Sequence, residues 1–552
     1  MTKESNPSTG SGQENLPFVV KTKNLIDELK AVCASYGLGN DGNEFKIISQ
    51  IFLYKFLNDK FAYEVKQIKP ELAKHEHWEN ELEKLNDNDY QMLRYQMSAS
   101  TAFLLPHQLL PNLFERQNEP DFAKTVDDTL MDIAATNNDL FAVKTEDGQK
   151  IRLFDRITEF VSSKRDAFAK ALFNKLVLFN FENIMGEGFD FFSTIFEYLI
   201  KDYNSDAGGK YAEYYTPHAV SKIIANILVP EPVSNKTCYD PSAGSGTLLM
   251  NLAHAIGQDK CTLYSQDISQ KSSNLLRLNL VLNNLVHSIE NVIQGNTMTD
   301  PYHKKDGKLR TFDYVVSNPP FKLDFSDDVE TLKKKENKDR FFAGIPNVPK
   351  KAKDKMAIYT LFLQHIMYSL NATGKAAMVV PTGFITAQSG IDKKIRQELV
   401  NSKMLAGVVS MPSNIFATTG TNVSIVFLDK TNKENVVLID ASNLGTTVKE
   451  GKNQKTLLSE TEEDHIIETF IQKTAVEDFS IVVSYEDIKS KNYSLSAGQY
   501  FEVKIEYIDI TTEEFDSKLK EFTSNLNELF NESALLEKEI KNNLKALIYE
   551  GS

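Results

Sequence analysis

The most chemically informative part of the sequence is an apolar run that leads into two adjacent prolines. Residues 312–316 read Phe-Asp-Tyr-Val-Val and predict a buried strand, and Asn318-Pro319-Pro320-Phe321 follows after one serine. Two prolines remove two backbone donors and stiffen the chain, so carbonyl groups stay free to accept hydrogen bonds. The Asn318 oxygen and the Pro319 carbonyl can together accept both hydrogens of an amino group, and Phe321 offers a face to a planar ring. A strand that simply ends in a proline turn is the alternative, and it accounts less well for so rare a combination.

A second candidate site is the glycine-rich segment 240–247, which reads Asp-Pro-Ser-Ala-Gly-Ser-Gly-Thr. It lies between a short predicted strand and a predicted helix. Glycines let the backbone approach a ligand closely, and a helix N-terminus offers free N–H groups. Asp240 ends the strand, where its carboxylate can accept a hydrogen bond from a ligand amine. By itself, this pattern favours an ordinary tight turn over a nucleotide-type site.

Asp267 ends the next predicted strand along the chain. An acidic residue at this place can hold the ribose hydroxyls of a bound nucleoside. Alone, it is explained more simply as a solvated residue at a strand end. Together with the glycine-rich segment before it, the nucleoside interpretation is favoured.

The elements that must position these residues follow an alternating pattern from about residue 230 onward. Short apolar runs alternate with helical segments, which predicts βαβ units and an α/β fold with a doubly wound, mostly parallel sheet. The predicted strands are 237–239, 262–265, 292–293, 312–316, 376–380, 405–410, 423–428 and 436–439. The predicted helices between them include 246–256, 270–285, 359–370 and 393–401.

The same pattern predicts the organisation of the whole chain. The segment 1–17 is rich in Ser, Gly, Thr, Asn and Pro and is expected to be disordered. Helical periodicity with few strand signals predicts an all-helical domain over 18–184. The sheet domain is expected over 185–475 and a C-terminal tail over 476–552.

Composition excludes several classes of protein. Hydrophobic residues make up 41% and charged residues 25% of the 552 residues, which excludes wholesale disorder, a collagen-like fibre and a membrane bundle. The net charge of −14 argues against a protein that grips nucleic acid with its whole surface, but it leaves room for a local basic site. Without a secretory signal pattern or an apolar run of about 18 residues, we expect no membrane association and a cytoplasmic location.

The three cysteines, Cys33, Cys238 and Cys261, lie far apart and show no metal-ligand spacing. A disulfide framework or a structural zinc site is therefore not expected, and a reducing compartment fits. We predict no metal site.

The C-terminal tail carries a heptad pattern. Thr511 and Glu514 form a capping-box signature, and apolar residues then recur at alternating four- and three-residue steps over 511–548. This predicts a coiled-coil-like helix. It either lies on its own domain or pairs with another subunit.

A lysine-rich insertion, residues 322–356, follows the Asn-Pro-Pro-Phe segment. Its basic residues include Lys333, Lys334, Lys335, Lys338, Arg340, Lys350, Lys351, Lys353 and Lys355. On so acidic a chain, the insertion is either a mobile loop that meets DNA phosphates or an ordinary solvated loop.

The motifs resemble those of amino-group methyltransferases that use S-adenosyl-L-methionine, and the chain resembles the modification (M) subunit of type I restriction–modification systems. Their methionine-binding turn resembles 240–247, and their catalytic tetrapeptide resembles 318–321. Further similar segments are 212–217 (Ala-Glu-Tyr-Tyr-Thr-Pro), 374–381, 411–416 (Met-Pro-Ser-Asn-Ile-Phe), 492–496 and parts of the helical domain.

This resemblance implies a DNA (adenine-N6) methyltransferase with a methyltransferase-type, Rossmann-like sheet. The flipped adenine would be held by the catalytic residues Asn318, Pro319, Pro320 and Phe321. The cofactor S-adenosyl-L-methionine would be held by Glu213, Tyr214, Tyr215, Thr216, Pro217, His218, Asp240, Pro241, Ser242, Gly244, Ser245, Gly246, Thr247, Asp267 and Asn296. The implied partners are DNA, a specificity (S) subunit bound by two M subunits, and a restriction (R) subunit.

Three positions depart from the family pattern. The family usually has Glu at the position of Asp267, and a shorter carboxylate makes the ribose contact less certain. Many related enzymes have Asp at the position of Asn296, which can still accept from or donate to the adenine ring. Met411 replaces the usual Leu.

Three rival functions stay open at this point. Similar tetrapeptides serve enzymes that methylate cytosine N4 or a protein glutamine amide, although Asn318 favours adenine over cytosine. The glutamine enzymes lack such a helical domain and heptad tail. A non-catalytic scaffold that binds the cofactor is the third, and the intact tetrapeptide argues against it.

Overall fold

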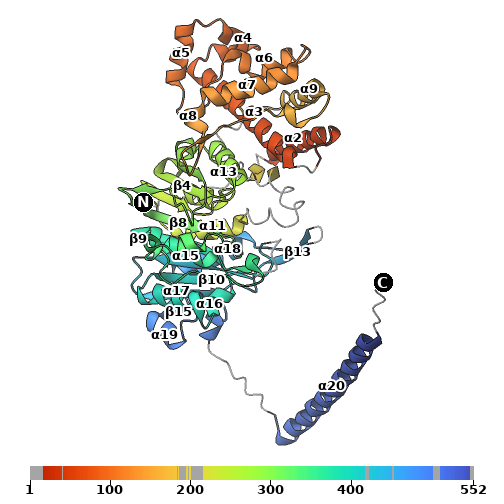
Figure 1. The fold of residues 1–552 in the computed structure, drawn as a ribbon, viewed down its shortest axis with the longest axis vertical. Coiled ribbons are helices and arrows are strands. Elements are labelled where there is room, and N and C mark those ends of the chain that lie inside the picture. Colours follow the sequence, from red (N-terminus) through yellow and green to blue (C-terminus); the bar gives the residue numbers. More distant parts are fainter. Residues whose placement is uncertain are drawn as a thin grey trace, which may run out of the picture. The chain divides into compact units, whose positions relative to one another are not determined.

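The computed structural model describes residues 16–39, 42–182, 185, 194–196, 198–199, 216–416, 422–450, 453–501 and 510–546. The chain divides into two compact units, residues 1–500 and residues 501–552. The first unit contains the predicted helical region and the predicted sheet (Figure 1). Of the segment 1–17, which the sequence predicts to be disordered, residues 1–15 lie outside the described residues, and residues 16 and 17 are instead the first of a helix.

The N-terminal part of the first unit is helical, as predicted. Its longest helix, α3, is buried along most of its surface, because apolar residues occur on all its sides. The other helices pack around it (Figure 1). Its helices are α2 (Leu16–Ser35), α3 (Gly42–Ile68), α4 (Trp78–Glu83), α5 (Asp87–Gln96), α6 (Leu110–Glu115), α7 (Phe122–Thr136), α8 (Asn138–Phe141) and α9 (Arg165–Leu176).

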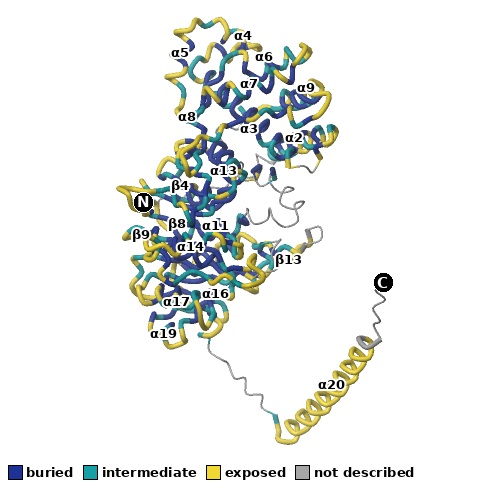
Figure 2. Tube along the Cα trace, viewed as in Figure 1, coloured by how far each residue is buried: buried dark blue, intermediate teal, exposed yellow. Residues whose placement is uncertain are grey.

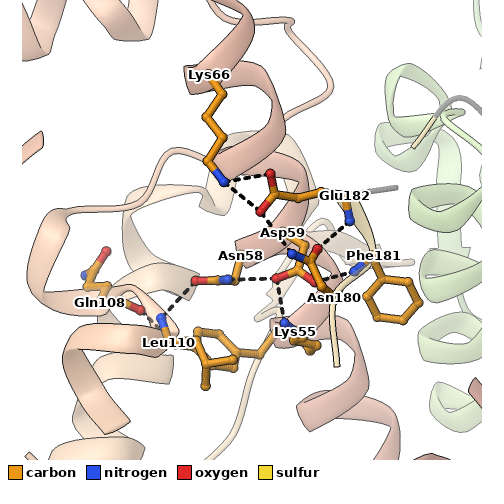
Figure 3. A network of polar contacts seen from close by, with 10 residues as sticks. Lys55, Asn58, Asp59, Lys66, Gln108, Leu110, Asn180, Phe181 and Glu182 are labelled. Carbon is orange, nitrogen blue, oxygen red and sulfur yellow. Dashed lines mark hydrogen bonds and ion pairs between the residues drawn. The ribbon is translucent and has the colours of Figure 1, made fainter. Parts of the chain in front are cut away.

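A buried ion pair within α3 includes the carboxylate that bonds this helix to residue 181 (Figure 3). The Lys55 ammonium lies 2.8 Å from Asp59 Oδ1, and the two side chains are only 5% and 3% exposed. The other carboxylate oxygen of Asp59 accepts the Phe181 N–H at 2.7 Å, and the Asn58 amide donates to Oδ1 at 2.9 Å. Burial raises the pKa of Asp59, although Lys55 opposes the shift. The pair therefore ties residue 181, which begins the link to the sheet domain, to the centre of the helical region.

The second part of the first unit is built on an 11-stranded sheet with the order β15-β12-β10-β11-β9-β8-β3-β4-β5-β1-β2. Most neighbouring pairs around its centre are parallel, and β11 and β15 are antiparallel to their neighbours. Its strands are β1 (Val143–Thr145), β2 (Lys150–Ile151), β3 (Lys236–Asp240), β4 (Cys261–Asp267), β5 (Val292–Gln294), β8 (Phe312–Ser317), β9 (Leu370–Pro381), β10 (Leu405–Ser410), β11 (Val423–Asp429), β12 (Asn435–Asp440) and β15 (Ser480–Ser484). The eight predicted strands and the predicted fold class are confirmed.

Helices cover this sheet, and its central strands are buried (Figure 2). One group of helices contacts β3, β4, β5, β8, β9 and β12, and in a second group α15 contacts β8 and β9 while α19 contacts β15. The first group consists of α11 (His218–Leu228), α12 (Thr247–Ile256), α13 (Gln270–Leu282) and α18 (Glu460–Ile471), and the second consists of α15 (Tyr359–Ser369), α16 (Gly383–Thr386), α17 (Gly390–Asn401) and α19 (Tyr485–Ser490). Among the described residues, no helix is both long and apolar enough to span a membrane.

The sheet extends beyond the boundaries that the sequence predicts for its domain. The hairpin β1–β2, which lies inside the predicted helical domain, adds to the sheet through parallel pairing of Lys144 with Ile293. At the other edge, β15 lies beyond residue 475 and pairs with β12. These strands are only two to five residues long, and such short strands carry little periodic signal.

The lysine-rich insertion is anchored to the body of the first unit. Its ends are joined, because the Leu323 N–H donates to the Met356 carbonyl at 3.1 Å. It contains the short helix α14 (Val329–Leu332), whose apolar residues are buried. Arg340 is only 2% exposed and donates to the Met298 carbonyl. This arginine is therefore an anchor and is not available to phosphates, whereas the lysines on either side of it are exposed.

The second unit is one long helix, α20 (Thr512–Ala546), which matches the predicted heptad helix over the described residues. The predicted capping box is confirmed by two hydrogen bonds between Thr511 and Glu514, at 3.0 and 3.2 Å. Its apolar side chains, including Phe515, Leu519 and Phe522, are 50–68% exposed (Figure 2). Residues 547 and 548 of the predicted helix lie outside the described residues.

Removal of the buried carboxylate should destabilise the protein. Asp59→Ala leaves the Lys55 ammonium without its ion-pair partner, so we expect the free energy of unfolding to fall by about 3–5 kcal/mol in urea denaturation. The control is Glu81→Ala, which removes a surface ion pair with Lys84 and should leave stability almost unchanged. Equal stability of the two variants would contradict the role assigned to the buried pair.

Candidate active site

The candidate site lies where the order of the sheet reverses. Strands β3, β4 and β5 follow one another in one direction, whereas β8 and β9 lie on the other side of β3. Ligands in doubly wound sheets bind beyond the carboxyl ends of the strands at such a switch point. Because β3 and β8 are parallel neighbours, their ends, Asp240 and Ser317, lie at the same edge. The two strand ends are therefore neighbours at this edge.

A pocket at this edge is formed by three stretches of chain that are far apart in the sequence. Thr216 precedes α11, residues 240–248 form the turn between β3 and α12, and Asn318 follows β8. The residues that line the pocket are Thr216, Asp240, Ser242, Ala243, Gly244, Ser245, Thr247, Leu248 and Asn318. The glycine-rich turn and the first residue of the tetrapeptide thus share one pocket.

Close packing explains why the turn needs its second glycine. Gly246 has a φ of +84°, and a Cβ built on it would lie 2.2 Å from Leu276 Cδ1 on α13. Any side chain here would strain the backbone and require the Leu276 side chain to move. Gly246 therefore lets the N-terminus of α12 sit close to α13, with its first N–H groups directed to the pocket edge.

Asp240 is the buried acid of the pocket. It is 1% exposed, and its Oδ1 accepts the Ser242 N–H at 2.9 Å. Burial raises its pKa to about 8, the negative charge of Asp267 adds to the rise, and hydrogen bonds from Ser242 and Ser317 oppose it. At neutral pH this carboxyl group is mostly protonated. A ligand cation beside it would stabilise the ionised form and lower its pKa.

Asp267 supports the turn from the neighbouring strand. Its Oδ2 accepts the Gly244 N–H at 2.9 Å and its Oδ1 accepts the Ser269 N–H at 2.8 Å. Burial raises the pKa of Asp267, and these two hydrogen bonds oppose the rise. Each carboxylate oxygen has a second lone pair, which leaves it able to accept from a ligand hydroxyl.

Asn318 is oriented by Thr216, which lies two residues before α11. Its Nδ2 donates to Thr216 Oγ1 at 3.2 Å, so the amide oxygen is the atom left to accept hydrogens. The serines at the two strand ends also meet, because Ser242 Oγ and Ser317 Oγ lie 2.6 Å apart. These contacts hold the tetrapeptide against the glycine-rich turn.

The rest of the tetrapeptide is held from the side of α15. Pro319 is buried, and the half-buried Phe321 ring packs edge-to-face on Tyr359 with 6.3 Å between ring centroids. The Tyr359 hydroxyl donates to Asp392 at 2.6 Å. Burial raises the pKa of Asp392, which the nearby Arg396 opposes.

The sequence comparison agrees with this geometry. The sequence model of the N-6 DNA methylase family matches residues 187–507, more than half of the chain. The chain belongs to this family. It is therefore a DNA methyltransferase, and the resemblance that the motifs indicated is confirmed.

The chain is also similar to methylase subunits of type I restriction enzymes. The type I restriction enzyme MpnII methylase subunit of Mycoplasma pneumoniae is 28% identical over 500 residues, which cover 84% of this chain and 87% of that protein. The type I restriction enzyme HindI methylase subunit of Haemophilus influenzae is 25% identical, and the matched region covers 65% of this chain and 79% of that protein. The crystal structure of the type I restriction-modification methyltransferase subunit from Streptococcus thermophilus has a TM-score of 0.71 and 22% identity, with 88% of this chain and 100% of that one covered, and shares the fold.

The structure brings seven of the predicted site residues into one pocket, namely Thr216, Asp240, Ser242, Gly244, Ser245, Thr247 and Asn318. Asp267 contacts the turn without lining the pocket, and Pro241 accepts a hydrogen bond from Thr297 at 2.7 Å. Asn296 follows β5 beside Asp267, and the Gly295 N–H donates to the Asp267 carbonyl at 2.9 Å. The predicted residues Glu213, Tyr214 and Tyr215 lie outside the described residues, and Pro217 and His218 begin α11 without lining the pocket.

Sequence reasoning missed several residues of this methylase site. Ala243 and Leu248 line the pocket, and Ser317 bonds to Ser242. The signal for Ser317 was available, because it is the last residue of a strand that leads directly to the tetrapeptide. Ala243 lies inside the glycine-rich segment 240–247 but was not named as a site residue, and no sequence signal pointed to Leu248, since apolar residues are common in helices.

Proposed function

We propose that this methylase is the modification subunit of a type I restriction–modification complex. It transfers a methyl group from S-adenosyl-L-methionine to the N6 amine of an adenine in DNA. The observation that carries this proposal is the pocket shared by the glycine-rich turn, Thr216 and Asn318, because a donor and an acceptor amine must meet for direct transfer. The family match and the names of the relatives support the type of reaction.

The β3 side of the pocket suits the donor. S-adenosyl-L-methionine supplies an electrophilic methyl group on a sulfonium. Asp240 would accept from the methionine amine, and Gly244 and Ser245 would back the ligand with the close turn described above. Asp267 would accept from the ribose hydroxyls. The residues around the start of α11 would wall the methionine end, namely Glu213, Tyr214, Tyr215, Thr216, Pro217 and His218.

The β8 side of the pocket suits the acceptor base. The amine of a paired adenine cannot reach the donor inside a duplex, so the base must be flipped out. The Asn318 oxygen and the Pro319 carbonyl would accept the two amine hydrogens, which offsets the positive charge that grows on nitrogen during attack. Phe321 would stack on the adenine ring. The donation from the Asn318 amide nitrogen to Thr216 supports this role, because it leaves the amide oxygen as the atom that can accept an amine hydrogen.

Other subunits would supply sequence choice. The relatives are named methylase subunits of type I restriction enzymes, and by this analogy a specificity subunit, bound by two M subunits, reads the DNA sequence while a restriction subunit joins the complex. The exposed apolar repeat of α20 supports a role as the helix that docks on the specificity subunit.

The insertion would contact the DNA backbone. Its exposed lysines follow the tetrapeptide directly, and the anchored ends and the buried Arg340 hold them near the site. Phosphate contacts by lysine are sequence-independent and release counterions.

Loss of the acceptor amide should separate catalysis from cofactor binding. We expect Asn318→Ala to lower tritiated methyl transfer to DNA by at least about 100-fold, because one preorganised acceptor is removed. Affinity for S-adenosyl-L-methionine should change by no more than a few-fold in calorimetry. Nucleoside mass analysis of the wild-type product should show N6-methyladenine. A large loss of cofactor affinity, or N4-methylcytosine as product, would overturn the assignment.

Asp240 should make cofactor binding depend on pH. Its pKa of about 8 means that it is protonated at pH 7 in the free protein, whereas a neighbouring ligand ammonium favours the ionised form. Binding at pH 7 should therefore release close to one proton, measured by calorimetry in buffers of different ionisation enthalpy. Affinity should rise from pH 6 to 7.5, below the titration of the ligand amine. Asp240→Asn should release none, and proton uptake by the wild type would contradict this account.

Neutralising insertion lysines should flatten the salt dependence of DNA binding. Lys334, Lys335 and Lys338 changed together to Gln should reduce the slope of log affinity against log salt by roughly 2 to 3, since each phosphate contact contributes about 0.9. Three exposed lysines that precede strands, and therefore lie at the opposite edge of the sheet, serve as the matched control: Lys260, Lys403 and Lys433. If the two triple variants showed equal slopes of log affinity against log salt, the insertion would be an ordinary solvated loop that does not contact DNA.

A further inference from the structure

Three segments that are distant in the sequence meet at the turn after β5, residues 295–298. From the hairpin β1–β2, Glu146 Oε2 accepts the Asn296 N–H at 2.8 Å. From the insertion, Asp328 Oδ2 accepts from the Asn296 side-chain amide at 3.3 Å, and Arg340 donates to the Met298 carbonyl. In the same turn, Thr297 Oγ1 donates to the Pro241 carbonyl at 2.7 Å, so the hairpin, the insertion and the glycine-rich segment are joined through this one turn.

The orientation of the Asn296 amide follows from its hydrogen bonds. Its Oδ1 accepts the Met298 N–H at 3.0 Å. A backbone N–H can only donate, so the oxygen is committed to the turn and the NH₂ group is the outer one. That NH₂ group donates to Asp328. A ligand amine beside Asn296 would therefore meet another donor unless the carboxylate of Asp328 accepted from it.

The sheet order places this turn next to the candidate ribose residue. Asp267 ends β4, β5 is the neighbour of β4 on the side away from β3, and the Gly295 N–H donates to the Asp267 carbonyl at 2.9 Å. A nucleoside whose amino-acid end lies at the β3 turn and whose ribose lies at Asp267 extends its base over the end of β5. The group that meets the base edge is then the pair of Asn296 and Asp328.

We propose that Asp328 is the acceptor for the 6-amino group of the adenine of the bound methyl donor. Asp328, which lies in the insertion, provides a carboxylate next to Asn296, whose own side chain is an amide. The proposal rests on the proposed function, because it needs an adenine nucleoside at this site. Asp328 is half-buried and stands at the N-cap position of α14 without a side-chain capping hydrogen bond, whereas its neighbour Asp327 is exposed. Glu146 accepts a main-chain N–H of the turn and therefore has a positioning role.

This assignment links the cofactor to the insertion. Asp328 lies in the segment that begins just after Phe321 and that also carries the exposed lysines. A cofactor base that bonds to Asp328 would hold this segment in place through the same residue that contacts Asn296. Cofactor recognition and the position of the insertion would thus share one side chain.

The test compares two ligands that differ at the 6-position of the purine. Calorimetry on the full-length chain measures the affinities for S-adenosylhomocysteine and for S-inosylhomocysteine, which has an oxygen in place of the amine. A carboxylate accepts from the amine and repels the oxygen, so the wild type should prefer the adenosyl ligand by about tenfold or more. Asp328→Asn should reduce this ratio by about tenfold, because the new amide can donate to the oxygen.

Two further variants keep the outcome clear. Asp327→Asn is the matched control and should keep the wild-type ratio. Asn296→Asp combined with Asp328→Asn moves the carboxylate to its partner residue and should restore the preference. An unchanged ratio in Asp328→Asn, or no restored preference in the double variant, would overturn the role of Asp328. A wild type that binds neither ligand would instead overturn the proposed function.

Discussion

The parallel pairing of β3 with β8 is the constraint on which the rest of the site depends. Residues 240 and 318 are far apart in the chain, and only this pairing places the glycine-rich turn beside the tetrapeptide. The order of the sheet reverses at β3, because β4 and β8 lie on opposite sides of it, and ligands in doubly wound sheets bind beyond the strand ends at such a point. A register shift of one residue would turn Asp240 to the other face of the sheet and separate it from the turn.

Burial around this pairing gives the site its electrostatic character. Asp240 and Asp267 are two acids at neighbouring strand ends, and the backbone N–H groups of the turn compensate them only in part. Their raised pKa values follow from burial and, for Asp240, from the charge of Asp267. Ionising these buried acids is therefore unfavourable in the free protein, and a cationic ligand beside them would stabilise their ionised form.

Several parts of the chain converge on the sheet edge and restrict one another. Thr216 orients Asn318, Tyr359 packs on Phe321, and Glu146 reaches from the helical region to the turn after β5. The insertion is bonded to that same turn by Asp328 and Arg340. Hydrogen bonds thus connect the segment that carries Glu146 and the insertion to the turn next to Asp267.

The sequence by itself determined the class of fold, the eight central strands and the chemical identity of the two motifs, because these depend on local patterns: alternation of apolar runs, a glycine turn and two prolines after a strand. Tertiary structure alone decided what depends on distant partners. Arg340 looks like any basic residue of a lysine-rich loop until the chain buries it against Met298, and β1 and β2 are too short to show periodicity until they pair with β5. The hydrogen bonds of Asn296 likewise come from residues about 30 and 150 positions away, a separation that no local pattern records.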